Sequence, residues 1–174
     1  MLFIQRIFLG ILMLIIFSTA FSQSNNTTTI IIVRHAEKDT GNNPVLTPVG
    51  MKRAEKLSSL FDGIKPDEIY STPYIRTMQT VTPWAKETAV EIKEYNPQNM
   101  MQFAEYLRAL KGKTVLIAGH SNTNPQLVNL LINEDKYKNL IDTDYETIFI
   151  VTVIDEVAKA KVMKNKNKSD LIKQ

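Results

Sequence analysis

The chain contains two histidines, His35 and His120, and each lies just past a run of apolar residues. In the stretch IIIVRHAEK, residues 30–38, an arginine and a histidine end a run of four β-branched residues. A further arginine, Arg76, lies in STPYIR, and His120 lies in VLIAGHSNT. Guanidinium forks match phosphate oxygens, one imidazole can attack phosphorus, and the other can donate a hydrogen bond to the oxygens. These residue types indicate a site for a phosphoryl group.

The order of these residues along the chain predicts that they converge. Residues 29–33 and 114–118 are continuous apolar runs, typical of strands buried on both faces of a parallel sheet, and 67–70 is a short strand candidate. In open α/β sheets, ligands bind outside the carboxyl ends of the strands. The residues just past these three strands are Arg34, His35, Arg76 and His120. We expect them at one sheet edge, where the N-termini of the following helices add partial positive charge.

The remaining elements are predicted from caps, periodicity and turns. Further strands are expected over 90–93, 147–154 and 157–163, the last two joined by a tight turn at Asp155-Glu156. A first helix is expected to begin at Thr47-Pro48 and to bury Ala54, Leu57, Leu60 and Phe61. A second helix is expected over 74–82, where Pro83 stops or kinks it. Two more helices are expected, one from Asn96-Pro97 to Gly112 and one beginning at Asn124-Pro125. This alternation predicts a three-layer α/β sandwich with a mainly parallel sheet, helices on both faces and a C-terminal hairpin at the edge.

Composition favours a single packed domain. The 174 residues are 44% hydrophobic, carry a net charge of +3 and include no cysteine, so the fold must hold without disulfides. We place the domain at 29–164 and a basic tail at 165–174, where a solvated end is favoured over contact with an anionic surface. No aromatic residue accompanies the tail lysines, so no nucleic-acid partner is expected.

Residues 1–22 have the features of a signal peptide. Arg6 precedes an apolar run over 7–17, and the small residues of STAFS fit a signal peptidase site. We therefore expect export to the periplasm or the exterior, with 23–28 as a short linker. The alternative is an uncleaved N-terminal anchor, the one case in which a membrane partner is expected, although the run is shorter than the roughly 20 residues of a comfortable span.

Four segments together resemble the histidine phosphatase superfamily, which has the phosphoglycerate mutase-like fold. They are VRHAEK, LTPVG, STPYIRTMQT and GHSNT, in that order, and the similarity runs from about residue 29 to the end of the last strand. The resemblance is to the small phosphatases of that superfamily. It implies that His35 is transiently phosphorylated, and that Arg34, Arg76 and His120 complete the phosphate pocket.

Other candidate site residues have two interpretations each. Ser121 and Asn122 either contact phosphate or cap the next helix. The resemblance implies a carboxylic acid after the third strand that protonates the leaving group, but this chain has Asn96 there. Glu94 lies two residues away, and Glu37 is the substitute candidate. The identity of the general acid stays open.

The interpretation that best fits these residues is an exported phosphomonoesterase that uses no metal or cofactor. Its substrate would be a phosphorylated small molecule or a phosphoprotein, as a phosphate ester or phosphoramidate. Alternatives are a phosphate-binding or regulatory module without turnover, a phosphomutase, and, least favoured, a metal enzyme, since two distant histidines without an acidic cluster make a poor ligand set. The non-functional alternative for His35 and His120 is a core histidine bonded to the backbone. For Arg34 and Arg76 it is a surface ion pair. The sequence leaves the oligomeric state open.

Overall fold

The structure is a computed structural model, and it describes residues 26–165. The predicted signal peptide at 1–22 and the tail beyond Asn165 lie outside the described residues. Within residues 26–165, no helix is both long and apolar enough to cross a membrane.

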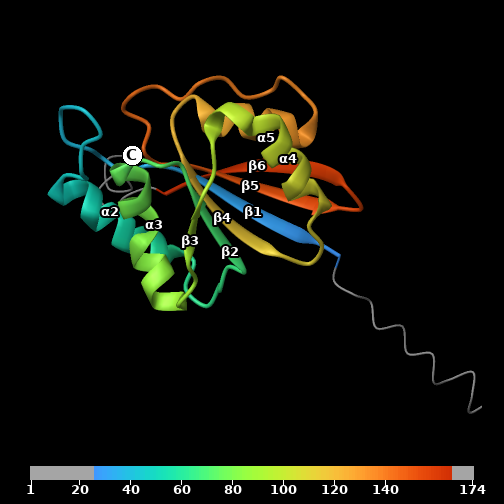
Figure 1. Ribbon diagram of the computed structural model, residues 1–174, viewed down its shortest axis with the longest axis horizontal. Coiled ribbons are helices and arrows are strands. Elements are labelled where there is room, and N and C mark those ends of the chain that lie inside the picture. The colour runs from blue at the N-terminus through green and yellow to red at the C-terminus, as the bar shows by residue number, and fades with distance from the viewer. Residues whose placement is uncertain (1–25, 166–174) are drawn as a thin grey trace, which may run out of the picture.

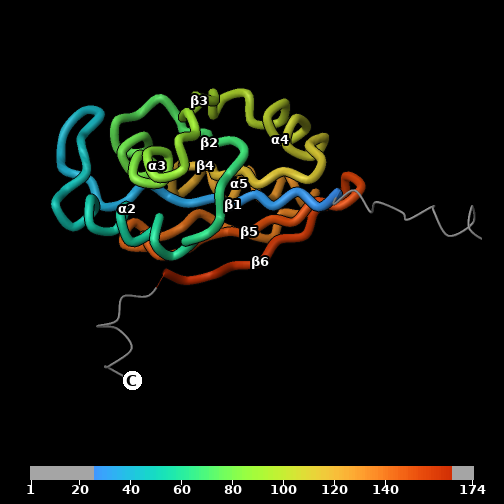
Figure 2. The backbone as a smooth tube through the Cα atoms, turned by 90° about the horizontal axis from the view of Figure 1, so that it is seen from below, coloured from blue at the N-terminus to red at the C-terminus, as the bar shows by residue number. Residues whose placement is uncertain are grey.

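A six-stranded sheet forms the centre of the molecule (Figure 1). Its strands are β1 (Thr28–Arg34), β2 (Glu68–Ser71), β3 (Ile92–Glu94), β4 (Thr114–Gly119), β5 (Thr147–Ile154) and β6 (Val157–Lys164). The spatial order is β3-β2-β4-β1-β5-β6, and the tube view places β3 and β6 towards opposite borders (Figure 2). The first four strands pair in parallel, whereas β5 pairs antiparallel with both β1 and β6. The predicted mainly parallel sheet with a hairpin at its edge is confirmed.

Helices cover both faces of the sheet, which confirms the three layers (Figure 1). The helices are α2 (Pro48–Leu60), α3 (Ile75–Thr88), α4 (Met100–Ala109) and α5 (Thr123–Ile132), and a 3-10 turn, η1 (Pro97–Asn99), precedes α4. Helices α2 and α3 pack on one face, and α4 and α5 pack on the other. Because side chains alternate along β1, Ile30 packs with α4 and α5 while Ile31 packs with α2 and α3.

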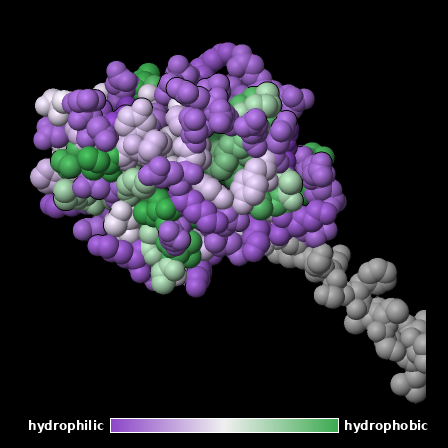
Figure 3. All heavy atoms as spheres, in the orientation of Figure 1, coloured by the Kyte–Doolittle hydropathy of each residue, from purple (hydrophilic) through white to green (hydrophobic). Residues whose placement is uncertain are grey.

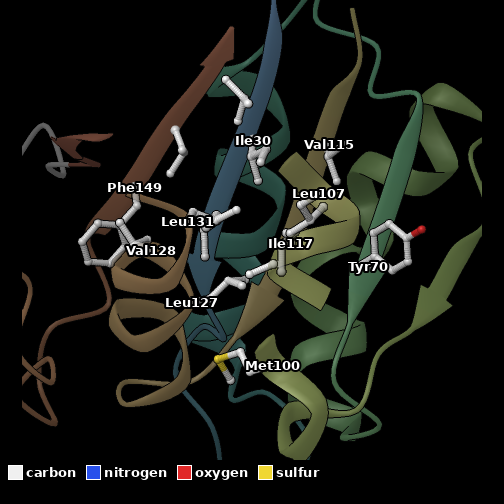
Figure 4. Close-up of a cluster of buried hydrophobic side chains, with 14 of the residues drawn as sticks. Ile30, Tyr70, Met100, Leu107, Val115, Ile117, Leu127, Val128, Leu131 and Phe149 are labelled. Atoms are coloured by element: carbon white, nitrogen blue, oxygen red, sulfur yellow. The ribbon is translucent and has the colours of Figure 1, made fainter. Parts of the chain in front are cut away.

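The core consists of one large apolar cluster on each face. Figure 4 shows the cluster beneath α4 and α5, where Leu107 and Leu131 lie over Ile30 and Ile117 of the sheet. These four side chains are at most 1% exposed. On the opposite face Trp84 stacks on Phe61, with 5.0 Å between ring centroids. Burial of β1 and β4 on both faces explains why their sequences are continuous rather than alternating.

The helix cap and the hairpin turn, which depend on only a few neighbouring residues, are formed as predicted. The Thr47 Oγ1 atom accepts a hydrogen bond from the N–H of Gly50, so Thr47 caps α2 as predicted. Asp155 and Glu156 have φ values of 47° and 68°, the left-handed pair that a tight hairpin turn requires.

Several element boundaries differ from the prediction. Helix α3 runs through Pro83 to Thr88, because burial of Trp84 against α2 compensates for the lost backbone hydrogen bond. Leu60 is 43% exposed rather than buried, since it lies in the last turn of α2. Strand β3 spans Ile92–Glu94 rather than the expected 90–93, and α5 begins at Thr123 rather than at Asn124.

The surface seen in Figure 3 is mostly polar, with apolar residues in small separate groups. Among the described residues, large exposed apolar side chains include Ile141, Val157 and Val49. They come from three separate parts of the chain, and single exposed apolar residues of this kind are normal on a folded domain.

Candidate active site

The four residues singled out in the sequence line one pocket at the carboxyl ends of the parallel strands. The pocket has a volume of about 540 Å³, and Arg34, His35, Arg76 and His120 are among its lining residues. The two imidazole rings lie edge to face, with their centroids 5.5 Å apart. Two guanidinium groups and two imidazoles therefore line one pocket.

Backbone hydrogen bonds hold His35 at the end of β1 and determine its tautomer. The His35 N–H donates to the carbonyl of Gly119 at 2.9 Å, which continues the pairing of β1 with β4. The Nδ1 atom lies 2.8 Å from the Ala36 carbonyl oxygen, which can only accept a hydrogen bond, so Nδ1 carries the proton. The lone pair of the neutral ring is then on Nε2, which has no hydrogen-bond partner among the described residues.

Both imidazoles are neutral at neutral pH. Burial, followed by the positive charges of Arg34 and Arg76, lowers the pKa of His35 from 6.5 to about 4, although its bond to Ala36 opposes the shift. Burial and the charges of Arg76, His35 and Arg34 lower the pKa of His120 to about 4 as well. A nucleophilic imidazole must be unprotonated, and burial together with the charges of the two arginines keeps His35 in that form.

These pKa values predict that the protein loses stability as pH falls from about 6.5 to about 4. In that range the unfolded chain binds more protons at His35 and His120 than the folded chain, so the free energy of unfolding rises with pH. Urea titrations across this window should show a steeper pH dependence for the wild type than for the double variant His35→Gln, His120→Gln. The carboxyl groups titrate in both proteins, so equal slopes would contradict the two histidine pKa values.

Arg76 is held between an aromatic ring and His120. Its guanidinium carbon lies 4.4 Å from the centroid of the Tyr74 ring, and one of its terminal nitrogens lies 3.4 Å from Nδ1 of His120. The Tyr74 ring also packs edge-on against His120 at 5.0 Å. Tyr74 therefore restrains both the cation and the imidazole, through a cation–π contact and an aromatic contact.

Arg34 is fixed by a loop that is distant in sequence. Its Nη1 atom donates to the carbonyl oxygens of Ile141, Asp142 and Asp144, at 2.9, 2.9 and 3.2 Å. The guanidinium carbon also lies 4.5 Å from the ring centroid of Tyr145. One arm of the guanidinium is thus committed to positioning, and the rest of the group is available to the pocket.

The His35 loop is tied to α3 through Thr80. The Ala36 N–H donates to the Thr80 Oγ1 atom at 2.9 Å, and that hydroxyl donates to the Arg76 carbonyl at 2.7 Å. Because Thr80 is almost fully buried, water cannot compete for these bonds. The residues that follow β1 and β2 are therefore held in one fixed relation.

A close approach at Gly119 brings the start of α5 next to the pocket. A Cβ atom at Gly119 would lie 2.1 Å from the Oδ1 atom of Asn124, so a side chain there would push the helix away. The His120 N–H donates to Thr123 Oγ1 at 2.9 Å in the same turn. The positive end of the α5 dipole thereby faces the site.

Glu37 does not occupy the position expected of a general acid. Both of its carboxylate oxygens accept hydrogen bonds from Arg53, at 2.6 to 3.0 Å, and it is not among the pocket-lining residues. The hydrogen bonds and charge of Arg53 outweigh the effect of burial and lower the pKa of Glu37, so the group is held ionised. This substitute candidate for the general acid is thus ionised and lies outside the pocket lining.

Asn96 and Glu94 lie beside the pocket rather than in it. The Asn96 Oδ1 atom caps η1 by accepting from the N–H of Gln98 at 2.9 Å. Glu94 and Asn96 line an adjoining hollow that shares Tyr74, Pro97 and Gln98 with the pocket. Gln98 is thus the polar side chain that β3 and η1 deliver to the site itself.

Ser121 and Asn122 both line the pocket. Asn122 is the N-cap residue of α5, yet its side chain makes no capping hydrogen bond. Of its two predicted roles, contact with a bound phosphate therefore fits the geometry better. The Thr123 hydroxyl accepts from the His120 N–H, which precedes the helix, so it caps none of the N–H groups of α5.

Sequence reasoning missed several pocket residues. Lys38, Tyr74, Gln98, Gln126 and Asp142 also line the pocket. Lys38 and Tyr74 follow β1 and β2 within a few residues, so the strand-end rule was a usable signal for them. Asp142 belongs to a loop between α5 and β5 that has no such signal.

The pocket is open on two sides. At Asn122 and Gln126 it joins a wider groove of about 950 Å³ between α5 and residues 133–139. On the other side it joins the hollow at Asn96. Within residues 26–165, no three His, Cys, Asp or Glu side chains are grouped so that they could hold a metal ion.

Comparison with protein families gives a match over part of the chain. The family model of the histidine phosphatase superfamily (branch 1) matches residues 30–96, a range that includes Arg34, His35 and Arg76 and ends before His120. A search of the curated proteins gave no match.

Solved structures with the same fold include phosphatases of several kinds and a phosphoglycerate mutase. The protein histidine phosphatase SixA complexed with tungstate is 18% identical, with a TM-score of 0.66 over 78% of this chain and 96% of that chain. A mycobacterial glucosyl-3-phosphoglycerate phosphatase is 9% identical, with a TM-score of 0.62 over 79% and 98%. A phosphoserine phosphatase from Entamoeba histolytica is 16% identical, with a TM-score of 0.57 over 81% and 98%. These TM-scores establish a shared fold, and with the family match over residues 30–96 they confirm the resemblance to the histidine phosphatase superfamily.

Proposed function

We propose that this chain, which has the histidine phosphatase fold, is a phosphomonoesterase that works through a phosphohistidine on His35. The observation that carries the proposal is the Nδ1–H bond of His35 to the Ala36 carbonyl. It leaves the Nε2 lone pair free in a pocket that also contains two guanidinium groups. A neutral, oriented imidazole beside two fixed cations is the arrangement that nucleophilic attack on phosphorus needs.

The proposed reaction has two steps. Nε2 of His35 forms a bond to phosphorus as the bond to the leaving group breaks, and the electron pair departs with the leaving group. Water then attacks the phosphoryl group, the phosphorus–nitrogen bond breaks, and inorganic phosphate and a proton are released. Arg34 and Arg76 stabilise the charge on the phosphoryl oxygens in both steps, and neutral His120 can accept the proton of the attacking water in the second step, so the proposal includes no metal or other cofactor.

The proposal favours substrates whose leaving group needs no proton from the protein. The one carboxylate among the pocket-lining residues is that of Asp142, an exposed residue. Glu37 is held ionised by Arg53, and Asn96 has no acidic proton. An alkoxide leaves poorly without protonation, whereas an activated phenolate leaves readily and a phosphoramidate takes its proton from solvent. Phosphoramidates and activated aryl esters are therefore the proposed substrate classes.

Asn96→Asp should raise the rate for alkyl phosphates far more than for activated aryl phosphates. A positioned acid is worth about 100- to 10,000-fold to a poor leaving group. Aspartate also caps helices well, so η1 should be preserved. Steady-state kcat/KM across leaving groups of graded basicity measures the effect. Asn96→Ser is the matched control, because it keeps the cap without adding an acid.

Asp142→Asn completes this test. A selective loss of alkyl phosphatase activity in that variant would identify Asp142 as the acid and would remove the need for one at residue 96. If none of these substitutions changes the dependence on the leaving group, protonation is not limiting and our interpretation of Asn96 fails.

Export is part of the proposal and rests on residues 1–22 alone. Cleavage should give a mature N-terminus near Gln23, which N-terminal sequencing of protein from the producing cell would establish. An intact N-terminus on membrane-bound protein would support the anchored alternative. The open pocket suits phosphate carried on a protein as well as on a small molecule.

A further inference from the structure

The ring of His120 contacts a buried pair of threonines on one side and the pocket on the other. Its Nε2 atom lies 2.9 Å from Oγ1 of Thr72, and that oxygen lies 3.0 Å from Oγ1 of Thr77. Both threonines are 0% exposed. Since neither hydroxyl is accessible to solvent, each hydroxyl proton must be donated to a neighbouring protein atom and not to water.

The donor and the acceptor of each hydrogen bond in this series can be deduced by starting from Thr77. The Thr77 hydroxyl lies 2.9 Å from the Thr72 carbonyl and 2.8 Å from the Tyr74 carbonyl, and carbonyl oxygens only accept. Thr77 therefore gives its single proton to a carbonyl. Thr72 must then donate to the Thr77 oxygen, which leaves Thr72 able only to accept from His120. The Nε2 atom of His120 must carry a proton.

The opposite side of the ring leads independently to the same tautomer. Nδ1 of His120 faces a terminal nitrogen of Arg76 at 3.4 Å. A guanidinium group has donors and no acceptor, so the neutral ring must present its lone pair there. Two unrelated neighbours thus require the same proton position, and His35 has the opposite one because its Nδ1 donates to Ala36.

We propose that Thr72, oriented by Thr77, is a positioning residue that fixes the Nε2–H tautomer of His120 and so directs Nδ1 at the phosphate pocket. The inference rests on the proposed function for its catalytic meaning. Without the threonine chain only the longer, 3.4 Å contact with Arg76 would favour this tautomer, so a fraction of the His120 rings would adopt the other tautomer or flip. Thr72 itself touches no reacting atom.

The proposal can be tested without any activity assay, because the chain has only two histidines. In protein labelled with ¹⁵N-histidine, the ring nitrogen shifts report which nitrogen is protonated, and His35→Gln assigns the two rings. At pH 7 we expect opposite tautomers, Nδ1–H for His35 and Nε2–H for His120. A wild-type His120 with its proton on Nδ1 would overturn the proposal.

Two substitutions separate tautomer control from simple packing. Thr77→Val keeps the Thr72 contact with His120 but frees the Thr72 proton, so His120 should become a mixture of tautomers. Thr72→Val should do the same and lower kcat on the order of tenfold, while Thr72→Ser should restore the Nε2–H form. Unchanged His120 shifts in Thr77→Val and Thr72→Val would refute the role.

Unchanged His35 ring shifts and an unchanged urea midpoint show that a variant has kept its fold. If Thr72→Val does not fold, the wild-type spectrum and Thr77→Val still decide the matter. Failure to trap a phosphoenzyme would remove the proposed function and leave the tautomer result intact, so the two failures are distinguishable.

Discussion

His35→Ala is expected to abolish both turnover and phosphoryl labelling of the protein. The neutral Nε2 atom of His35 is the group we propose to attack phosphorus, and its role is to divide one hydrolysis into two transfers. Brief incubation with an activated phosphoryl donor, followed by intact-protein mass spectrometry and peptide mapping, would place the label on His35 in the wild type. Label on another residue with turnover intact would disprove the assignment.

His120→Ala is the informative comparison for that experiment. It removes a ring that lies 5.5 Å from His35 in the same pocket but leaves the proposed nucleophile in place. We expect slow labelling in His120→Ala and none in His35→Ala. A wild-type protein that binds phosphate without labelling or turnover would instead support the phosphate-binding alternative.

Arg76→Lys is expected to lower kcat/KM by about 100-fold, similar to the loss of one preorganised oxyanion donor. An ammonium group carries the same charge, but it cannot reproduce a planar fork of donors. In this structure the substitution also removes the contact of the guanidinium with the Tyr74 ring and its contact with His120. A near-normal rate for Arg76→Lys would place this side chain outside the reaction.

Arg108→Lys is the matched control for this prediction, since Arg108 lies on α4 and is not among the pocket-lining residues. It should leave the rate within about twofold of the wild type, as surface substitutions usually do.

Exhaustive chelation of the wild type should also leave the rate unchanged, because the arginines supply the charge that Mg²⁺ provides in other phosphoryl-transfer sites. Loss of activity in chelator, restored by one metal, would overturn the metal-free proposal.

The sequence by itself determined the central sheet and the meeting of four side chains at its edge. Strands β1 and β4 are buried on both faces, and that environment produces continuous apolar runs that are readable without a structure. The carboxyl ends of parallel strands share one edge, so residues just past them must approach one another. Arg34, His35 and His120 were therefore predictable from position alone.

Only the tertiary structure decided which neighbours those residues acquire. Glu37 pairs with Arg53, sixteen residues away, and the carbonyls that hold Arg34 come from a loop more than a hundred residues away. Likewise α3 continues past Pro83 because Trp84 packs on Phe61. Such contacts depend on how elements pack, and local propensity carries no information about them.

The tautomers of the two histidines show the same division most clearly. That each histidine follows a buried strand is a property of the local sequence. Which ring nitrogen carries the proton depends on the Ala36 carbonyl for His35, and on Thr72 and Arg76 for His120. Thr72 directly follows β2 and Arg76 lies in α3, and the pairing of β2 with β4 brings both next to His120. Periodicity can place an imidazole at a sheet edge, but the hydrogen-bond partners that orient it are assembled by the fold.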